Sequence, residues 1–311
     1  MRSTDCSVVA ETVLTLAVLL QAGLSPARAW EHLAGIGDEA AARVCAAVAR
    51  GVPVAPAIAA VAPAPSAGSR FLRRTSSSAD ADGSSAWLDV SAAWGVATTV
   101  GAPLAESLRG IAASLRDAQE ARDDIRVALA EPAGTARLMG WLPLVAVGLG
   151  VALGFDTIGM LVRQPIGVVC LAAGLALIAA SRRWTRSLVR SARAAAGVPG
   201  LDADLLAIAL SGGVSIDRAR SLVADARGCE TDAATLGILA LSRSAGVPAV
   251  ELLRASATLA RHRARIDGRV RAARLSSRLL LPLGVCTLPA FLLLGVAPML
   301  LSVFSTVPVD L

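Results

Sequence analysis

The sequence predicts an all-helical membrane protein with two helical-bundle modules and three transmembrane helices. Three observations lead to this fold class. The chain of 311 residues has a hydrophobic content of 55% and a mean hydropathy of +0.62, values typical of membrane proteins. It also contains long apolar runs without charge, and glycine corners that recur between helical segments.

Five short segments are expected to end one helix and begin the next. In "AGVPAVELLRASA", residues 245–257, Gly246 suits the left-handed conformation that ends many helices, and Pro248 suits the first turn of the following one. Similar corners contain Gly23, Gly51, Gly101 with Pro103, and Gly213. Ser25 and Ser215 can act as N-caps. The polar parts of the chain are therefore predicted to be packed helical hairpins.

Three uncharged stretches are candidates for membrane spans of about 20 apolar residues. They are residues 138–155, 165–181 and 279–304, and the first two form a hairpin around residues 156–164. Arginines gather beside one end of each span, at positions Arg137, Arg182, Arg183, Arg186, Arg269, Arg271, Arg274 and Arg278, whereas the hairpin turn has only Arg163. The positive-inside rule then predicts a cytoplasmic N-terminus with residues 1–137 and 182–278 in the cytoplasm, and the turn and tail 305–311 outside.

Two parts of the chain align with each other. Residues 17–30 match residues 207–220 at an offset of 190, and residues 100–110 match residues 245–255 at an offset of 145. The first alignment pairs Gly23 with Gly213, and the second pairs Gly101, Pro103 and Glu106 with Gly246, Pro248 and Glu251. The modules at 1–137 and 182–278 are thus predicted to be copies. The first has an insertion around Gly51 and a Ser-rich linker at 66–85, so we expect about six helices in it and about four in the second.

The first apolar segment has an alternative interpretation as a cleaved signal peptide. Residues 8–20 are apolar, and Ala27-Arg28-Ala29 resembles a cleavage site, which would reverse the topology. However, Glu11 and Gln21 interrupt the run, and part of the segment recurs inside the second module. We therefore predict a module helix.

Each module ends in a long amphipathic helix. Its buried face is predicted from apolar residues at helical spacing, which are Leu104, Leu108, Ile111 and Leu115 in one copy and Leu252, Leu259, Ile266 and Ala273 in the other. The opposite faces are charged, which fits either a solvated surface or a docking surface for a protein or for anionic lipid. Glu106 and Glu251 precede Arg109 and Arg254 by three residues, the spacing of a local ion pair. Their recurrence also fits a shared contact role.

The residues do not predict an enzyme, a cofactor site or a metal site. The chain contains no lysine, so a phosphate-binding P-loop is absent, and neither C-x-x-C nor G-x-S-x-G occurs. His32 and His262 are isolated in sequence. Three acidic pairs receive structural interpretations: Asp80 and Asp82 in the linker, Asp123 and Asp124 on a helix face, and Asp202 and Asp204 at a helix N-cap.

Two helical modules, each with a glycine corner and a late "G-x-P-x-x-E-x-L-R" turn, followed by a membrane hairpin and then a terminal span, resemble the type II secretion F family. The short turn "DTIGMLVRQPIG" is most similar to the tight-adherence (Tad, Flp) pilus members of the TadB and TadC kind. The resemblance implies a non-catalytic platform in the inner membrane that couples a cytoplasmic secretion ATPase to pilin assembly or protein secretion. It also implies assembly with itself or with another platform protein of the family.

The alternative function is an oligomeric membrane transporter or channel subunit. The spans contain few of the ionisable residues on which transport usually depends. A nucleic-acid partner is not predicted, because aromatic residues are only 3% of the chain. The candidate turn or partner-contact positions are Gly23, Gly101, Pro103, Glu106, Gly213, Gly246, Pro248 and Glu251.

Overall fold

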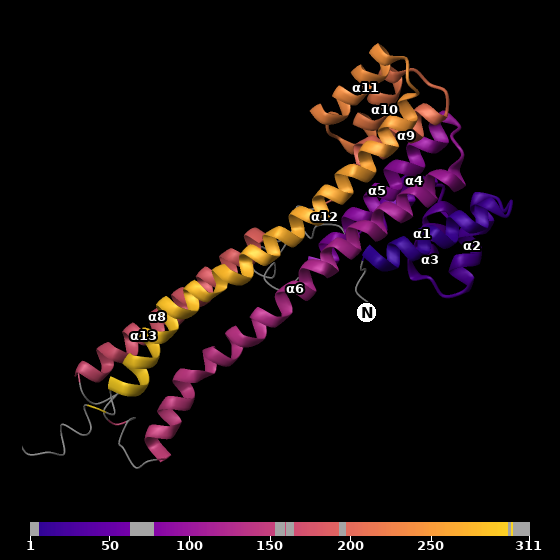
Figure 1. The fold of residues 1–311 in the computed structure, drawn as a ribbon. Coiled ribbons are helices and arrows are strands. Elements are labelled where there is room, and N and C mark those ends of the chain that lie inside the picture. Colours follow the sequence, from indigo (N-terminus) through magenta and orange to yellow (C-terminus); the bar gives the residue numbers. More distant parts are fainter. Residues whose placement is uncertain are drawn as a thin grey trace, which may run out of the picture. The chain divides into compact units, whose positions relative to one another are not determined.

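The computed structural model describes residues 6–62, 78–152, 159, 165–192, 197–297 and 300, which contain helices and no strand (Figure 1). The first part of the chain forms α1 (Cys6–Gln21), α2 (Pro26–Gly35), α3 (Glu39–Ala49), α4 (Val54–Ala59), α5 (Ser78–Val100) and α6 (Leu104–Ala152). The rest forms α8 (Pro165–Ala192), α9 (Leu201–Ser211), α10 (Ile216–Arg227), α11 (Ala233–Ala245) and α12 (Ala249–Pro282), followed by the π-helical turn η1 (Leu283–Thr287), α13 (Leu288–Phe291) and the π-helical turn η2 (Leu292–Val296).

The predicted glycine corners are confirmed. All five glycines have positive φ values, which are 92° at Gly23, 85° at Gly51, 71° at Gly101, 82° at Gly213 and 68° at Gly246. A residue with a Cβ atom rarely adopts this backbone conformation. Glycine therefore permits the chain to end one helix and start the next within a few residues.

The serine N-caps are confirmed in part. The Ser215 hydroxyl accepts a hydrogen bond from the Arg218 amide at 3.3 Å, whereas Ser25 occupies the N-cap of α2 without a side-chain bond. The helix α9 does not begin with an aspartate cap as predicted, because Gly200 occupies its N-cap in the left-handed conformation. Asp202 and Asp204 lie in the first turn instead, where the helix dipole favours negative charge.

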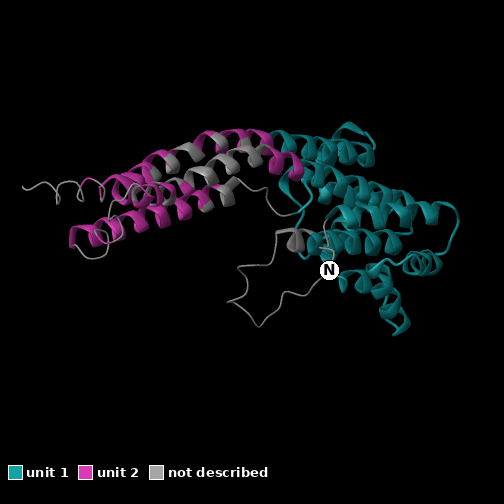
Figure 2. Cartoon of the chain, turned by 90° about the horizontal axis from the view of Figure 1, so that it is seen from below, with its two compact units in different colours: residues 1–121, 195–266 teal, residues 122–194, 267–311 magenta. Residues whose placement is uncertain are grey.

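The chain divides into two compact units, shown in teal and magenta in Figure 2. Unit 1 comprises residues 1–121 and 195–266, and unit 2 comprises residues 122–194 and 267–311. Both α6 and α12 begin in unit 1 and end in unit 2. They are therefore the two continuous helices that belong to both units.

Unit 1 has one hydrophobic core to which both predicted modules contribute. The helix α5 packs against α1 and α4 from the first segment and against α9 and α10 from the second. The largest buried side chains include Trp87 and Leu108 from the first segment and Leu205 and Leu253 from the second. The two sequence segments thus fold together. The first segment contains α1 to α6, and the described residues of the second contain the end of α8 and α9 to α12.

Two details of the predicted helices are wrong. Residues 78–85 of the Ser-rich linker are helical, since α5 begins at Ser78. The buried Ala86 and Trp87 that follow show that tertiary packing outweighs the weak helix propensity of serine and glycine. In α12 the residues fully buried in the core are Leu253 and Ala257, not the predicted Leu252 stripe. Leu259 and Ile266 of that stripe are each 46% exposed. Residues 63–77 lie outside the described part of the chain.

Unit 2 contains α8 packed against η1, α13 and η2. Gly174 permits the close approach, because a Cβ there would lie 2.5 Å from Cγ of Leu294. Many large apolar side chains of this unit are exposed, including Trp141, Val145 and Leu149 of α6 and Ile166, Val169 and Leu175 of α8. One described helix, Pro165–Thr185, is long and apolar enough to cross a membrane.

The predicted third span is described at residues 279–297 and 300, and it is not a regular α-helix throughout. Two π-helical turns, η1 and η2, interrupt it on either side of Pro289. A proline in a helix lacks an amide hydrogen and its ring clashes with the preceding turn, which a locally wider turn relieves. Residues 156–158 and 160–164 of the hairpin turn and the tail 305–311 lie outside the described residues. That the stretches 138–155, 165–181 and 279–304 cross a membrane stays a prediction.

Candidate functional site

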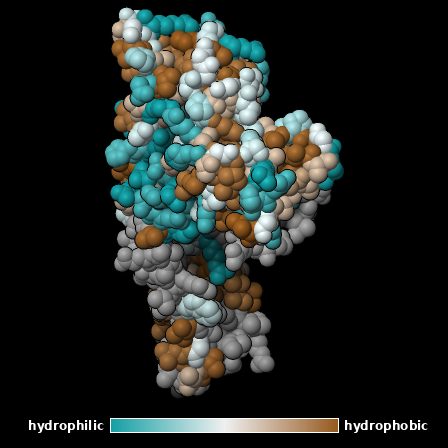
Figure 3. Space-filling model, turned by 90° about the vertical axis from the view of Figure 1, so that its right-hand side faces the viewer, coloured by the Kyte–Doolittle hydropathy of each residue, from teal (hydrophilic) through white to brown (hydrophobic). Residues whose placement is uncertain are grey.

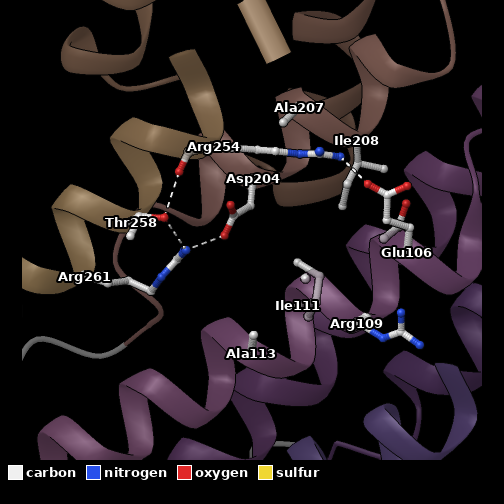
Figure 4. Close-up of a pocket in the computed structure, with 12 residues that line it drawn as sticks. Glu106, Arg109, Ile111, Ala113, Asp204, Ala207, Ile208, Arg254, Thr258 and Arg261 are labelled. Atoms are coloured by element: carbon white, nitrogen blue, oxygen red, sulfur yellow. Dashed lines mark hydrogen bonds and ion pairs between the residues drawn. The ribbon is translucent and has the colours of Figure 1, made fainter. Parts of the chain in front are cut away.

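A pocket of about 360 Å³ lies in unit 1 between α6, α9 and α12 (Figure 4). Its apolar lining includes Ile111, Ala207 and Ile208, and its polar lining includes three arginines, two acidic residues and Thr258. The charged residues are Glu106, Arg109, Asp204, Arg254 and Arg261. The pocket therefore brings charges from both predicted modules to one place.

Asp204 and Arg261 form the most buried ion pair of the pocket. Their side chains are 14% and 13% exposed, and Nη1 of Arg261 lies 2.7 Å from Oδ2 of Asp204. The Ser114 hydroxyl donates a second hydrogen bond of 2.8 Å to the same oxygen. Arg261 also lies 3.3 Å from a carboxylate oxygen of Asp117. One guanidinium on α12 therefore joins α6 to α9.

Burial decides the protonation behaviour of Asp204. Removal from water raises the pKa of its carboxyl above the usual value, although Arg261, Ser114 and Arg254 act in the opposite direction. The protonated form of Asp204 is therefore easier to reach than that of an exposed aspartate.

Glu106 and Arg254 connect the two modules at the exposed end of the pocket. Nη2 of Arg254 lies 2.8 Å from Oε1 of Glu106, with side chains 46% and 58% exposed (Figure 4). The sequence predicts a local pair of Glu106 with Arg109 in the same helix, whereas the Arg109 guanidinium donates to the Gln21 amide oxygen. The second predicted local pair, Glu251 with Arg254, is present only at 4.0 Å. The stronger contact is thus between modules.

A row of ion pairs continues along α6 and α12 within unit 1. Arg265 on α12 lies 3.0 Å from Glu120 and 3.7 Å from Asp117 on α6. In every pair the arginine follows its acidic partner by nearly the same number of residues, such as 148 for Glu106 and 145 for Glu120. A constant difference in residue number means that the two helices run parallel. Here the acidic face of α6 meets the basic face of α12, and we call this row the α6–α12 seam.

The sequence predicts that the charged faces of α6 and α12 are either solvated or docking surfaces. The seam shows that part of each face is used inside the chain. Figure 3 presents a broad hydrophilic area, drawn in teal, on one face of the molecule. In unit 2 the same pattern appears between Arg269 and Asp124, 2.8 Å apart and 145 residues apart in sequence. Ile125 of unit 2 lies beside Gly268, where a Cβ would approach to 2.9 Å.

Of the sequence-predicted positions, Glu106 alone lines the pocket. The glycines Gly23, Gly101, Gly213 and Gly246 form helix corners, and Pro103 and Pro248 immediately precede α6 and α12. Glu251 is 72% exposed. These positions are not brought together into one site.

Sequence reasoning missed Asp204, Arg261 and Ser114. One signal could have found the seam: the offset of 145 aligns Glu120 with Arg265 and Asp124 with Arg269. Opposite charges at equivalent positions of two long helices indicate that these helices lie side by side.

The described residues contain no group of three or more His, Cys, Asp or Glu side chains that could hold a metal ion. All five cysteines are free thiols. The lining of the pocket offers paired charges and the hydroxyls of Ser107 and Thr258.

Residues 12–152 match the family model described as type II secretion system (T2SS), protein F. Over this segment, a little under half of its length, the chain is similar to the type II secretion system F family. The matched segment runs from Thr12 in α1 to Ala152 at the end of α6, so it supplies Glu106, Ser114 and Asp117 to the site. No curated protein and no solved structure matches the chain. Members of the F family are inner-membrane components of secretion-system platforms.

Proposed function

We propose that this chain is a non-catalytic platform subunit of a Tad-type (Flp) pilus or type II secretion apparatus. It couples a cytoplasmic ATPase to pilin assembly or protein secretion. The observation that carries the proposal is that α6, part of the matched family segment, begins in unit 1 with its packed core and ends in unit 2 with its exposed apolar side chains. An exposed apolar surface of this kind is typical of contact with a membrane.

The membrane arrangement in this proposal has three spans, residues 138–155, 165–181 and 279–304. The apolar helix Pro165–Thr185 supports the second span. In the third, Leu281, Val285, Leu288 and Leu292 are exposed at a spacing of four, three and four residues, which is one face of a helix. Lipid chains would cover this face. The arginine distribution supports a cytoplasmic N-terminus and a C-terminus outside.

The proposed mechanism uses the two continuous helices. A partner that moves unit 1 acts on α6 and α12, whose residues continue into unit 2. The partners are a secretion or pilus ATPase, pilin subunits and another F-family platform protein. Energy comes from the ATPase, so the chain itself needs no catalytic group.

The direct test is affinity capture of the tagged chain from gently solubilised membranes, followed by mass spectrometry. We expect a secretion-type ATPase and pilus components to co-purify, and deletion of the gene to abolish pilus assembly or secretion. Unchanged assembly and secretion after deletion would overturn the proposal. Solute or ion flux through the reconstituted chain, with no secretion partner captured, would favour the transporter.

Topology is tested separately with reporter fusions. A periplasmic alkaline phosphatase reporter fused after Leu311 is expected to be active, and the same reporter fused after Arg227 is expected to be inactive. The reverse pattern would contradict the proposed orientation.

A further inference from the structure

The helices α5 and α11 occupy the same place in the order of helices, since each precedes a corner with the glycine and proline pattern. The offset of 145 aligns Ala92, Val96 and Val100 of α5 with Gly237, Leu241 and Ala245 of α11. These two sets of three residues lie on one face of their helix, because they are spaced by four residues. The surroundings of the two faces can therefore be compared directly.

The face on α5 is covered by the second module. Ala92 is 7% and Val96 is 2% exposed, and α5 packs against both α9 and α10. Val100 lies against Gly212, where an added Cβ would come within 2.7 Å of the Val100 carbonyl oxygen. One turn before Ala92, Asp89 forms an ion pair of 3.5 Å with Arg227 of α10.

The equivalent face on α11 is exposed. Gly237, Leu241 and Ala245 are all exposed, with Leu241 at 53%. A Cβ on Gly237 would meet no atom of the described chain within 4 Å. This face combines one large apolar side chain with two small residues, which permits a second helix to approach closely.

The helices α9 and α1 differ in the same way: the face of α9 that packs against α5 is buried, whereas the equivalent face of α1 is exposed. The offset of 190 aligns Leu205, Ile208 and Gly212, at the C-cap of α9, with Thr15, Val18 and Ala22, the residue that follows α1. Leu205 and Ile208 are buried at 0% and 7%, and Gly212 is in contact with α5. The α1 residues are exposed, with Val18 at 52%. The chain therefore exposes two faces, on α11 and α1, that are equivalent to the two faces by which α5 and α9 pack against each other.

We propose that the α11 face (Gly237, Leu241, Ala245) of one copy binds the α1 face (Thr15, Val18, Ala22) of a second copy of this chain. The contact repeats the packing of α5 against α9, and Ala245 of one copy meets Ala22 of the next as Val100 meets Gly212. Because the two faces differ, the contact is head-to-tail, and each copy has one α11 face and one α1 face to offer. Successive copies then form a closed ring or an open chain.

The contact between copies lacks one feature of the internal one. The positions equivalent to Asp89 and Arg227 are Ala234 and Gly37, which cannot form an ion pair. The contact between copies is thus held by apolar side chains and depends little on salt.

Cross-linking of paired cysteines tests the geometry. Ala22→Cys and Ala245→Cys are introduced in separate full-length chains that carry Cys45→Ala, Cys170→Ala and Cys229→Ala, and the chains are mixed in detergent with a short bifunctional maleimide. We expect a cross-linked dimer from the mixture and none from either variant alone. A dimer of Ala245→Cys with itself indicates a two-fold contact and overturns the head-to-tail arrangement. No dimer in the mixture overturns the proposal.

A matched pair of substitutions tests the surface without introduced cysteines. Leu241→Arg and Leu88→Arg replace leucines of almost equal exposure, 53% and 52%, on α11 and α5. We expect Leu241→Arg to weaken self-association about tenfold, measured by sedimentation of the solubilised chain, and Leu88→Arg to leave it unchanged. Equal effects, or a wild-type chain that stays monomeric, overturn the proposal. If the monomeric chain still captures a secretion ATPase, this inference fails while the proposed function stands.

Discussion

Glu120 of α6 and Arg265 of α12 form an ion pair of 3.0 Å, and they are 145 positions apart in the chain. The same interval separates the corner Gly101 from the corner Gly246. Equivalent positions of the two aligned segments therefore face each other, with an acid in the first and an arginine in the second. If the contacting faces of α6 and α12 carried the same charge, the two helices would repel each other. Opposite charges at these positions permit the two parallel helices to stay in contact.

The Glu106–Arg254 contact should be measurable as a coupling energy. A double-mutant cycle with Glu106→Gln and Arg254→Gln is expected to give about 0.2–1 kcal/mol, because both side chains are about half exposed. Glu251→Gln is the matched control, since its carboxylate is 4.0 Å from the same arginine. Thermal unfolding of the full chain in detergent at low and high salt provides the measurement. A larger coupling for Glu251 would contradict the assigned pair.

Loss of Arg261 should destabilise unit 1 more than loss of a surface arginine. Arg261→Ala leaves the carboxylates of Asp204 and Asp117 without their shared cation, and we expect a loss of about 1–3 kcal/mol. Arg243→Ala is the control, because Arg243 is 56% exposed and pairs with the exposed Asp217 at 3.3 Å. Its expected effect is below about 0.5 kcal/mol. Similar unfolding free energies for the two variants would show that the buried network contributes nothing.

The raised pKa of Asp204 predicts a pH dependence with a definite sign. Between the unfolded value of about 3.9 and the raised native value, the folded chain holds a proton that the unfolded chain has released. Stability therefore falls as the pH rises through this window. Relative to Asp204→Asn, the wild type should gain stability on acidification from neutral pH and stop gaining below about pH 3.9. A relative loss of wild-type stability on acidification would refute this sign.

Two glycines separate backbone strain from steric clash. Gly213→Ala places a Cβ in open space at a φ of 82°, so only the left-handed conformation is penalised, by about 1–2 kcal/mol. Gly200→Ala has a similar φ of 78°, but its Cβ would lie 2.7 Å from the Ala257 Cα atom. Overpacking adds about 1–3 kcal/mol, so Gly200→Ala should be the less stable variant in chemical unfolding. Equal losses would mean that α12 moves away from α9 at no cost.

Local rules predicted the helices and corners well. Gly23, Gly101 and Gly246 have the positive φ that their sequence context indicated, because a helix end depends on a few neighbouring residues. Leu108, Ile111 and Leu115 are buried as their spacing predicted. The start of α5 was missed since it depends on Trp87 and Ala86 packing in a core formed by distant segments.

The site could not be predicted from either module alone. Asp204 is in a sequence pattern that fits a helix cap, and its burial results from α6 and α12 closing over α9. Arg254 lies closer to Glu106 than to Glu251, because α6 places the Glu106 carboxylate beside the Arg254 guanidinium. Sequence spacing describes neighbours within one helix, whereas both contacts are between helices.

The α6–α12 seam restricts insertions in either of its two helices. Adding one residue to α6 between Gly101 and Glu120 would rotate every later side chain by about 100° around the helix axis, since 3.6 residues make a turn. Glu120 would then point away from Arg265, although no charge had been altered. An insertion in one of these helices is therefore compensated only by an insertion at the equivalent place in the other.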